Sequence, residues 1–466
     1  MAPQPTSEGP AKGLWGGRFT SGMAPEMVPF NLCLPVDGRL WREDIRGSKA
    51  WAAALVEAGV LSAEEGHALL RGLDQVAERI EREGLADAPE EDIHSAVERM
   101  LGEAVGEVAG KLHTGRSRND QSSTDVRLFG MAAADRIDAE LVHVVEGLLA
   151  LAETGVDAVM PGYTHLQQGQ PIRAAHWALA HVWAFLRDRE RTEAARAAAG
   201  VLPLGSGAIA GCPFPVDREA LRRELGFRRV SENSVDAVGD RDWICDLAYA
   251  GAMAGVHLSR LGEDLVLFSS TEFGFVRLSD GFSTGSSLMP QKRNPDVAEL
   301  ARGKSGRLVG NLTALLTLLK GLPTGYNRDL QEDKEALFDT VDTLLLTLPA
   351  VAEAVATASF RPERMSRVMD AQLLATDLAD YLVRAGVPFR ESHEVVGRLV
   401  RRAEEDGSSL SDLPQEAFAA EHPAFGDDVR DVFDWRRSAD SRDSDGGTSR
   451  RSVLAQIAEA RRRLGK

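Results

Sequence analysis

The chain has few cysteines and no long apolar run. Its 466 residues include only three cysteines, Cys33, Cys212 and Cys245, which are far apart and form no C-x-x-C pair. This number and spacing exclude a disulfide framework and a thiolate metal site. No apolar run approaches the length of about 18 residues that a membrane-spanning helix needs, so we expect no membrane span.

Sequence signatures of metal and cofactor sites are also missing. The ten histidines form no H-E-x-x-H motif, and no Walker or dinucleotide-binding glycine pattern follows a credible strand. We therefore expect neither a metal nor an organic cofactor. The formal net charge of −17 argues against nucleic acid or an anionic membrane as a main partner, because phosphate binding needs an excess of basic residues. A local cluster of Arg and Lys remains able to bind a small anion.

Aromatic residues make up only 6% of the chain and alternating strand-like runs are scarce, so a sheet-based domain is not expected. Helical periodicity dominates instead. Apolar residues recur at steps of four and three at Ile137, Leu141, Val144, Leu148 and Leu151. This stripe predicts a helix from about residue 120 to 154, roughly 50 Å long, which needs a long bundle to cover it.

We predict an all-α fold with three helical segments. Residues 1–13, rich in Pro, Gly and Ser, form a disordered tail without the apolar region of a secretion signal, as in a cytoplasmic protein. Shorter helices follow in 14–115, the long helices in 116–366, and short helices punctuated by Gly and Pro in 367–466.

A polar loop, Gly-Ser-Ser-Leu-Met-Pro-Gln-Lys-Arg-Asn-Pro-Asp, occupies residues 285–296 ahead of a predicted helix. It buries little apolar area, so folding alone gives little reason for it. Its hydroxyls, lysine, amides and backbone N–H groups suit the binding of carboxylates. A simple capping loop explains Asn294 and Pro295, but not the paired serines, Met-Pro and Lys292 together.

This loop resembles the signature loop of the fumarase/aspartase superfamily, whose members eliminate across a Cα–Cβ bond and release fumarate. Gln291 and Arg293 resemble the argininosuccinate lyase branch. Further blocks agree in the same order over nearly the whole chain, at residues 14–19, 91–94, 111–121, 162–167, 202–208 and 326–335. The resemblance implies a homotetramer in which loops from different subunits form each site, and which cleaves 2-(Nω-L-arginino)succinate to arginine and fumarate in arginine biosynthesis.

Four residues are candidates for the chemistry. Ser286 is the proposed base, since its anion would be stabilised by Lys292 and by loop N–H groups. Ser287 is the local alternative. His165 would pass a proton to the leaving nitrogen, directly or through water, and Glu299 resembles the acidic partner that fixes its tautomer.

The substrate-binding candidates come from the other blocks. Arg118 and Asn119 form a carboxylate clamp, although Asn119 or Asp120 is also a good helix N-cap. The remaining candidates are Thr164, Asn294, His94, Tyr326, Gln331 and Lys334, the last two lying three apart on one predicted helix face. Asp329, Glu332 and Asp333 offer acids for a guanidinium group. Arg241 is equally consistent with a site residue and with a salt bridge inside the bundle.

One substrate-binding candidate departs from the family pattern. Cys33, after Leu32, falls where the family usually has serine, and a thiol is the weaker hydrogen-bond donor. This change is the only support for one alternative, a related lyase acting on another N-substituted succinate. A second alternative is a catalytically silent oligomer like the lens crystallins of this family, although the intact set of Ser286, Lys292, His165 and Glu299 argues against it.

Overall fold

The computed structural model describes residues 23–86 and 88–466, so the tail at 1–13 and the block at 14–19 lie outside the described residues. Regular structure is predominantly α-helical, which confirms the predicted fold class. The chain divides into two compact units. Unit 1 combines Met1–Ala133, Arg196–Cys245 and Ala314–Phe338, and unit 2 combines Ala134–Ala195, Asp246–Thr313 and Asp339–Lys466. The sequence boundaries near residues 115 and 366 stay a prediction.

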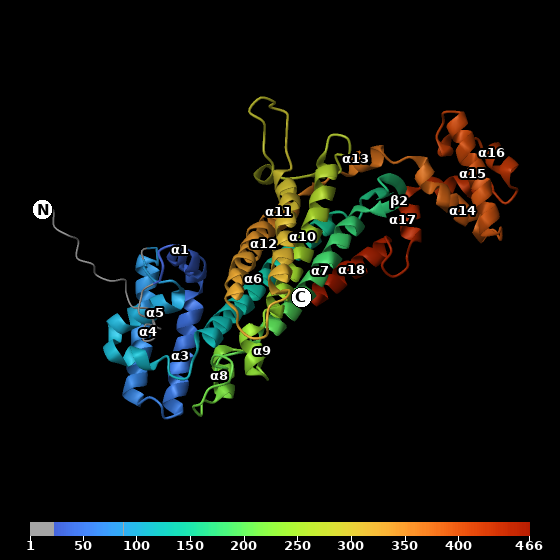
Figure 1. The fold of residues 1–466 in the computed structure, drawn as a ribbon. Helices are drawn as coiled ribbons and strands as arrows, with labels where there is room; N and C mark the ends of the chain where they lie inside the picture. Colours follow the sequence, from blue (N-terminus) through green and yellow to red (C-terminus); the bar gives the residue numbers. More distant parts are fainter. Residues whose placement is uncertain (1–22, 87) are drawn as a thin grey trace. The chain divides into compact units, whose positions relative to one another are not determined.

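Long helices dominate the described chain (Figure 1). Their bounds are α6 Arg118–Thr154, α7 Ala174–Ala199, α10 Asp242–Ser269, α11 Asp296–Leu319 and α12 Asp333–Ala356. The bounds of α6 match the helix predicted at 120–154. Each of these helices contributes residues to both units.

Glycines bring the long helices of unit 2 close together. A Cβ added to Gly262 of α10 would lie 2.6 Å from the carbonyl oxygen of Ala298 on α11. A Cβ on Gly147 of α6 would lie 2.6 Å from the carbonyl oxygen of Ala352 on α12. Because no side chain tolerates such distances, glycine at these positions permits direct backbone packing of the bundle.

The N-terminal stretch of unit 1 packs three helices around an apolar core. Trp51, Leu55, Leu69 and Leu73 are fully buried there. The entry of α4 is fixed by a capping box between Ser62 and Glu65. The helices of this unit, besides the ends of the long ones, are α1 Met27–Asn31, α2 Leu34–Asp37, α3 Trp41–Glu57, α4 Ala63–Glu83, α5 Ile93–Val105, α8 Arg218–Leu225 and α9 Ser234–Gly239.

Short helices fill the C-terminal stretch of unit 2, as the spacing of Gly and Pro predicts. Leu378, Leu399, Phe418 and Val429 belong to an apolar cluster of this stretch. The helices are α13 Pro362–Arg367, α14 Ala375–Arg384, α15 Phe389–Glu405, α16 Gln415–Glu421, α17 Trp435–Ser441 and α18 Arg450–Arg463.

Within residues 23–86 and 88–466, three pairs of short strands interrupt the helices. They are β1 Val159–Thr164 with β2 Gln167–Arg173, β3 Val201–Leu202 with β4 Arg229–Val230, and β5 Val276–Arg277 with β6 Ser359–Phe360. Around His165, β1 and β2 form an antiparallel hairpin, and α7 starts at Ala174. Proline disfavours helical backbone in the residue before it, so the chain stays extended before Pro171.

The described residues bear on the cysteines and on membrane-spanning helices. Cys33, Cys212 and Cys245 all lie in the described part and are free thiols. Within the same part, no helix combines the length and apolar character needed to cross a membrane.

Candidate active site

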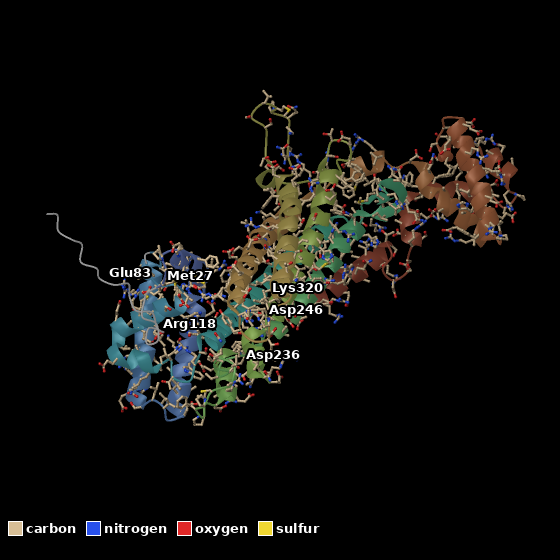
Figure 2. All side chains as sticks on the ribbon, viewed as in Figure 1. Met27, Glu83, Arg118, Asp236, Asp246 and Lys320 are labelled. Atoms are coloured by element: carbon tan, nitrogen blue, oxygen red, sulfur yellow. The ribbon has the colours of Figure 1, made fainter. Side chains whose placement is uncertain are left out.

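The predicted clamp residue Arg118 lies at the start of α6 (Figure 2). Its Nη2 donates to Ser95 Oγ at 3.1 Å, and its Nε lies 3.3 Å from Asp92 Oδ2, so it faces the first turn of α5. Its Nη1 donates to Gln121 Oε1 at 3.2 Å. The guanidinium is thus fixed between the first turns of α5 and α6, where helix dipoles favour an anion.

The prediction that Asn119 or Asp120 caps α6 is wrong, because the helix already begins at Arg118. Ser117, just before the helix, accepts a hydrogen bond on its Oγ from the backbone N–H of Asn119 at 3.3 Å. Asp120 Oδ1 reaches back and accepts the backbone N–H of Ser117 at 2.9 Å. This reciprocal arrangement satisfies two N–H groups that the helix leaves unpaired.

Asp120 is an anchor that the sequence did not reveal. Its Oδ2 accepts the backbone N–H groups of Gly205 at 3.0 Å and Gly207 at 2.8 Å. Asn119 Nδ2 donates to the carbonyl oxygen of Ala208 at 3.2 Å. The motif at 202–208 is therefore attached to the clamp. Burial raises the pKa of Asp120 to about 6, although these backbone bonds act in the opposite direction.

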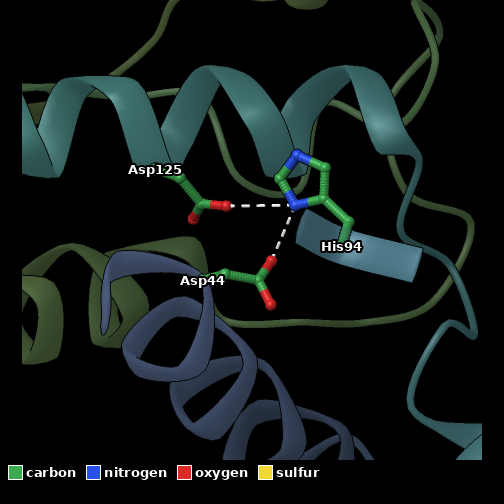
Figure 3. A group of neighbouring side chains, drawn as sticks. All are labelled: Asp44, His94 and Asp125. Carbon is green, nitrogen blue, oxygen red and sulfur yellow. Dashed lines mark hydrogen bonds and ion pairs between the residues drawn. The ribbon is translucent and has the colours of Figure 1, made fainter. Parts of the chain in front are cut away.

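His94 lies in a buried group with Asp44 of α3 and Asp125 of α6 (Figure 3). Its Nδ1 is 2.8 Å from Asp44 Oδ1 and 3.4 Å from Asp125 Oδ2. Gln121 Nε2 donates to the same Asp44 oxygen at 2.6 Å. A direct substrate contact by His94 stays a prediction; its burial favours action through Gln121, which also binds Arg118.

The pKa values of the Asp44 and Asp125 carboxyl groups are shifted in opposite directions. Burial alone would raise the pKa of Asp44, but the hydrogen bond and charge of His94 and the charge of Arg116 hold it well below its usual range. Burial and the adjacent Asp44 charge raise the pKa of Asp125 well above its usual range. The Asp44 carboxyl therefore loses its proton at a lower pH than the Asp125 carboxyl does.

This group also has the spacing of a metal site. One ligand atom from each of Asp44, His94 and Asp125 lies within 4.8 Å of the others. The His94 ring already bonds to Asp44, and the buried Arg116 guanidinium interacts with the charges of both Asp44 and Asp125.

His113, in the block before α6, gives the fold a dependence on pH. Burial lowers the pKa of His113 to about 4, and the charges of Arg116 and Arg118 add to the effect. An unfolded histidine has a pKa of about 6.5, so between these values the unfolded chain binds the proton and the folded chain does not. The stabilisation is complete above about pH 6.5 and is lost as the pH falls toward 4.

We therefore expect the stability of the wild-type chain to fall between pH 7 and pH 5, with His113 contributing about 1 kcal/mol of the loss after allowance for its partial exposure. Urea unfolding at fixed protein concentration measures this. His113→Gln should remove that contribution, whereas His67→Gln, at an exposed position of α4, should not. An unchanged pH slope in His113→Gln would contradict the assignment.

Tyr326, Gln331 and Lys334 are brought together in unit 1, as their proposed common role requires. Gln331 Nε2 donates to the Tyr326 hydroxyl at 2.9 Å, and Lys334 Nζ donates to Gln331 Oε1 at 3.2 Å. Gln331 lies in a 3-10 turn and Lys334 in the first turn of α12, so the three-residue spacing still aligns them.

Arg241 is a salt-bridge residue, which settles the alternative left open by the sequence. Its Nε donates to Asp333 Oδ2 at 2.5 Å, and Lys334 Nζ lies 3.0 Å from Asp333 Oδ1. All three side chains are buried. Asp333 is consequently not an acid available for a substrate guanidinium, whereas Asp329 and Glu332 are exposed.

Cys33 lies between two other motif blocks of unit 1. Its backbone N–H donates to the carbonyl oxygen of Glu91 at 2.7 Å. Its thiol donates to the carbonyl oxygen of Asn31 at 3.4 Å and accepts from Arg328 Nη2 at 3.5 Å. Burial raises the pKa of the Cys33 thiol, although Arg328 opposes the effect. Cys33 thus shares the neighbourhood of Tyr326 and Lys334.

The remaining candidates belong to unit 2. Thr164 and His165 are exposed at the turn of the β1–β2 hairpin. His165 and Leu166 have φ values of 56° and 57°, a left-handed backbone that non-glycine residues rarely adopt. Such strain at an exposed turn is more common at functional sites than elsewhere.

The signature loop is a hairpin of unit 2 closed by backbone bonds between Thr284 and Asn294 at 2.8 and 3.2 Å. Ser286 Oγ accepts the backbone N–H groups of Leu288 at 3.2 Å and Met289 at 3.1 Å. Lys292 is exposed in the same hairpin. The two N–H groups are suitably placed to stabilise a serine anion.

The candidates therefore form separate groups within one chain. Arg118, Asn119, Tyr326, Gln331 and Lys334 lie in unit 1, together with Cys33 and His94, and the four proposed chemical residues lie in unit 2 with Thr164 and Asn294. Among the hydrogen bonds and ion pairs of the described residues, none joins His165 to Glu299 or Ser286 to Lys292.

Comparisons with known proteins cover the same regions. The profile of the family described as Lyase matches residues 17–310, and that of the argininosuccinate lyase C-terminal family matches residues 372–440. The argininosuccinate lyase of Roseiflexus castenholzii is 56% identical over 97% of this chain and its own whole length. That of Roseiflexus sp. strain RS-1 is 58% identical over 96% of this chain and 99% of its own.

A solved structure agrees with the sequence comparisons. An EDDS lyase variant with bound fumarate aligns with a TM-score of 0.83 at 29% identity, covering 96% of this chain and 91% of its own. The ordered motifs, the helical fold and the full-length similarity lead to one conclusion: the chain belongs to the argininosuccinate lyase family.

Proposed function

We propose that this chain is a carbon–nitrogen lyase that eliminates fumarate from argininosuccinate and releases L-arginine, in arginine biosynthesis and in the cytoplasm. The observation that carries the proposal is the pair of backbone N–H groups on Ser286 Oγ, because they make the signature serine a usable base. Full-length identity above one half to argininosuccinate lyases supports the substrate.

The reaction follows from these groups. Ionised Ser286 takes a proton from the succinyl carbon next to a carboxylate, and Lys292 and Asn294 balance the charge that this carboxylate gains. The electron pair forms the double bond of fumarate as the C–N bond breaks. The leaving nitrogen receives a proton from His165, directly or through water, with Glu299 as its acidic partner. Arg118 and Asn119 bind a carboxylate, and Tyr326, Gln331 and Lys334 bind the other end of the substrate.

We propose that the sites are shared between subunits of a homotetramer. Leu300 and Val309 of α11 and Leu346 of α12 are 61%, 44% and 63% exposed, which is unusual for apolar residues inside long bundle helices. Burying them against other copies of the chain would also let the two groups of candidates come from different subunits.

The activity is tested by following fumarate absorbance with argininosuccinate, adenylosuccinate, aspartate, malate and EDDS. Turnover of argininosuccinate with a kcat/KM far above the others is expected. EDDS is included because an EDDS lyase is a structural relative. Preference for another compound would establish the alternative lyase, and no turnover of any would establish a catalytically silent oligomer.

Cys33→Ser is expected to lower the Michaelis constant for argininosuccinate by about threefold to tenfold with little change in kcat. The hydroxyl is the stronger donor, and such a contact acts equally on bound substrate and transition state. Initial-rate kinetics measure the effect.

An alkylating reagent supplies the control for Cys33. It should inactivate the wild type slowly, because the raised pKa of the Cys33 thiol leaves little thiolate. Argininosuccinate should protect the wild type, and Cys33→Ser should be resistant. An unchanged Michaelis constant together with no protection by substrate would show that Cys33 only packs in the fold.

A further inference from the structure

A cavity of about 240 Å³ lies in unit 2 at the base of the signature hairpin. Its polar lining comes from Arg277, Arg293, Arg361, Ser269, Ser283 and Asn294. No carboxylate lines it among the described residues. Three exposed arginines from separate segments therefore line one small space in a chain whose net charge is −17.

The backbone around this cavity is well fixed. Val276 and Arg277 of β5 pair with Phe360 and Ser359 of β6, and the backbone N–H of Arg361 donates to the carbonyl oxygen of Phe275 at 2.9 Å. Arg277 thus lies on β5, and Arg361 directly follows the neighbouring strand β6. Arg277 pairs with Ser359, so Arg361 lies two residues further along, on a diagonal that long side chains can span.

Carboxylates of the described chain neutralise these three arginine charges only in part. Arg293 is bound by Asp280 at 2.5 Å and by the carbonyl oxygen of Leu278 at 2.9 Å. The pKa of Asp280 is lowered mainly by the hydrogen bond and charge of Arg293, and to a smaller extent by the charge of Arg277. Neither Arg277 nor Arg361 forms an ion pair with any carboxylate in the described part of the chain. Asp280, itself exposed, thus interacts with two of the three arginines.

We propose that this cavity binds a small multivalent oxyanion, either inorganic phosphate or a dicarboxylate, at the base of the signature loop. Guanidinium groups bind both kinds of anion through paired N–H donors. The cavity volume lies below the roughly 300–1,000 Å³ typical of drug-sized ligand sites, which favours a small ion. Bound there, the anion joins Arg293 of the loop to Arg277 and Arg361 outside it and restrains the hairpin.

Calorimetric titration of the full-length protein with phosphate, and separately with succinate, tests the site at about 0.15 M chloride, where exposed charges are largely screened. We expect one anion to bind per chain. Whichever of phosphate and succinate has the lower Kd identifies the class of anion that the cavity prefers. The double variant Arg277→Gln/Arg361→Gln should bind about tenfold or more weakly. The double variant Arg277→Lys/Arg361→Lys keeps both charges and should bind with an intermediate affinity. It tests the site even if the glutamine double variant does not fold.

Two controls separate this site from the proposed active site. Arg390→Gln, an exposed arginine on α15, should leave binding unchanged, and Ser286→Ala should bind the anion like wild type. Equal binding by wild type and the glutamine double variant, or no measurable binding of either anion, would each overturn the proposal. Because the readout is binding, the result is independent of whether argininosuccinate is cleaved.

The loop gives a second readout. Lys292 and Arg293 are exposed trypsin sites in the hairpin. The anion should slow cleavage there in wild type but not in the glutamine double variant, with a small chromogenic trypsin substrate as the control for effects on the protease. Equal protection of both proteins would count against restraint of the hairpin by this cavity.

Discussion

Ser286→Ala is expected to abolish turnover, with kcat reduced by about a hundredfold to ten-thousandfold, the usual contribution of a positioned base. The hydroxyl of Ser286 accepts two loop N–H groups and contributes nothing to the packing of the helical bundle. The fumarate assay measures the loss, and circular dichroism and sedimentation should show unchanged helicity and assembly.

Ser287→Ala is the matched control for this prediction. Ser287 is exposed in the same loop and has no such pair of backbone donors on its oxygen. Its variant should keep activity within a few-fold of wild type. Near-normal activity of Ser286→Ala together with an inactive Ser287→Ala would show that the neighbouring serine is the base.

Mixing two inactive variants, His165→Asn and Ser286→Ala, is expected to recover up to about a quarter of wild-type activity. If each site takes the His165 hairpin from one subunit and the signature loop from another, random assembly leaves about one site in four without either lesion. The variants should be unfolded together, refolded together, and shown by two affinity tags to share tetramers.

A second mixture tests the reasoning. Ser286→Ala and Lys292→Met both alter the signature loop, so each loop in a mixed tetramer carries one lesion and no activity should return. Recovery in neither mixture, in tetramers shown to be mixed, would falsify shared sites. Recovery of activity in both mixtures would show that the recovery does not come from combining an intact His165 hairpin with an intact signature loop.

Helical content and the extent of α6 were determined by local sequence. The apolar stripe of Ile137, Leu141 and Val144 repeats at the helical period, and that period depends only on neighbours along the chain. The signature loop is also recognisable locally, since its serines, lysine and amides occur together without an apolar pattern.

Local sequence gave less information at the helix starts. Asn119 and Asp120 are both good capping residues, and propensity alone cannot reveal that Ser117 precedes the helix while Asp120 binds Gly205 and Gly207. Those two glycines are more than eighty residues away in sequence. Asp120 and Asp125 are acidic residues in a helical segment that is otherwise buried. Aspartates in such a place are the signal that could have indicated buried hydrogen-bond partners.

Tertiary structure decided which charged motif residues are available to a substrate. Asp329, Glu332 and Asp333 are equally acidic in the sequence, but only Asp333 is buried between Arg241 and Lys334. The same holds for the arginines at the base of the signature hairpin, which come from three separate segments. Period and propensity are properties of adjacent residues, whereas burial and ion pairing depend on which distant segments the fold brings into contact.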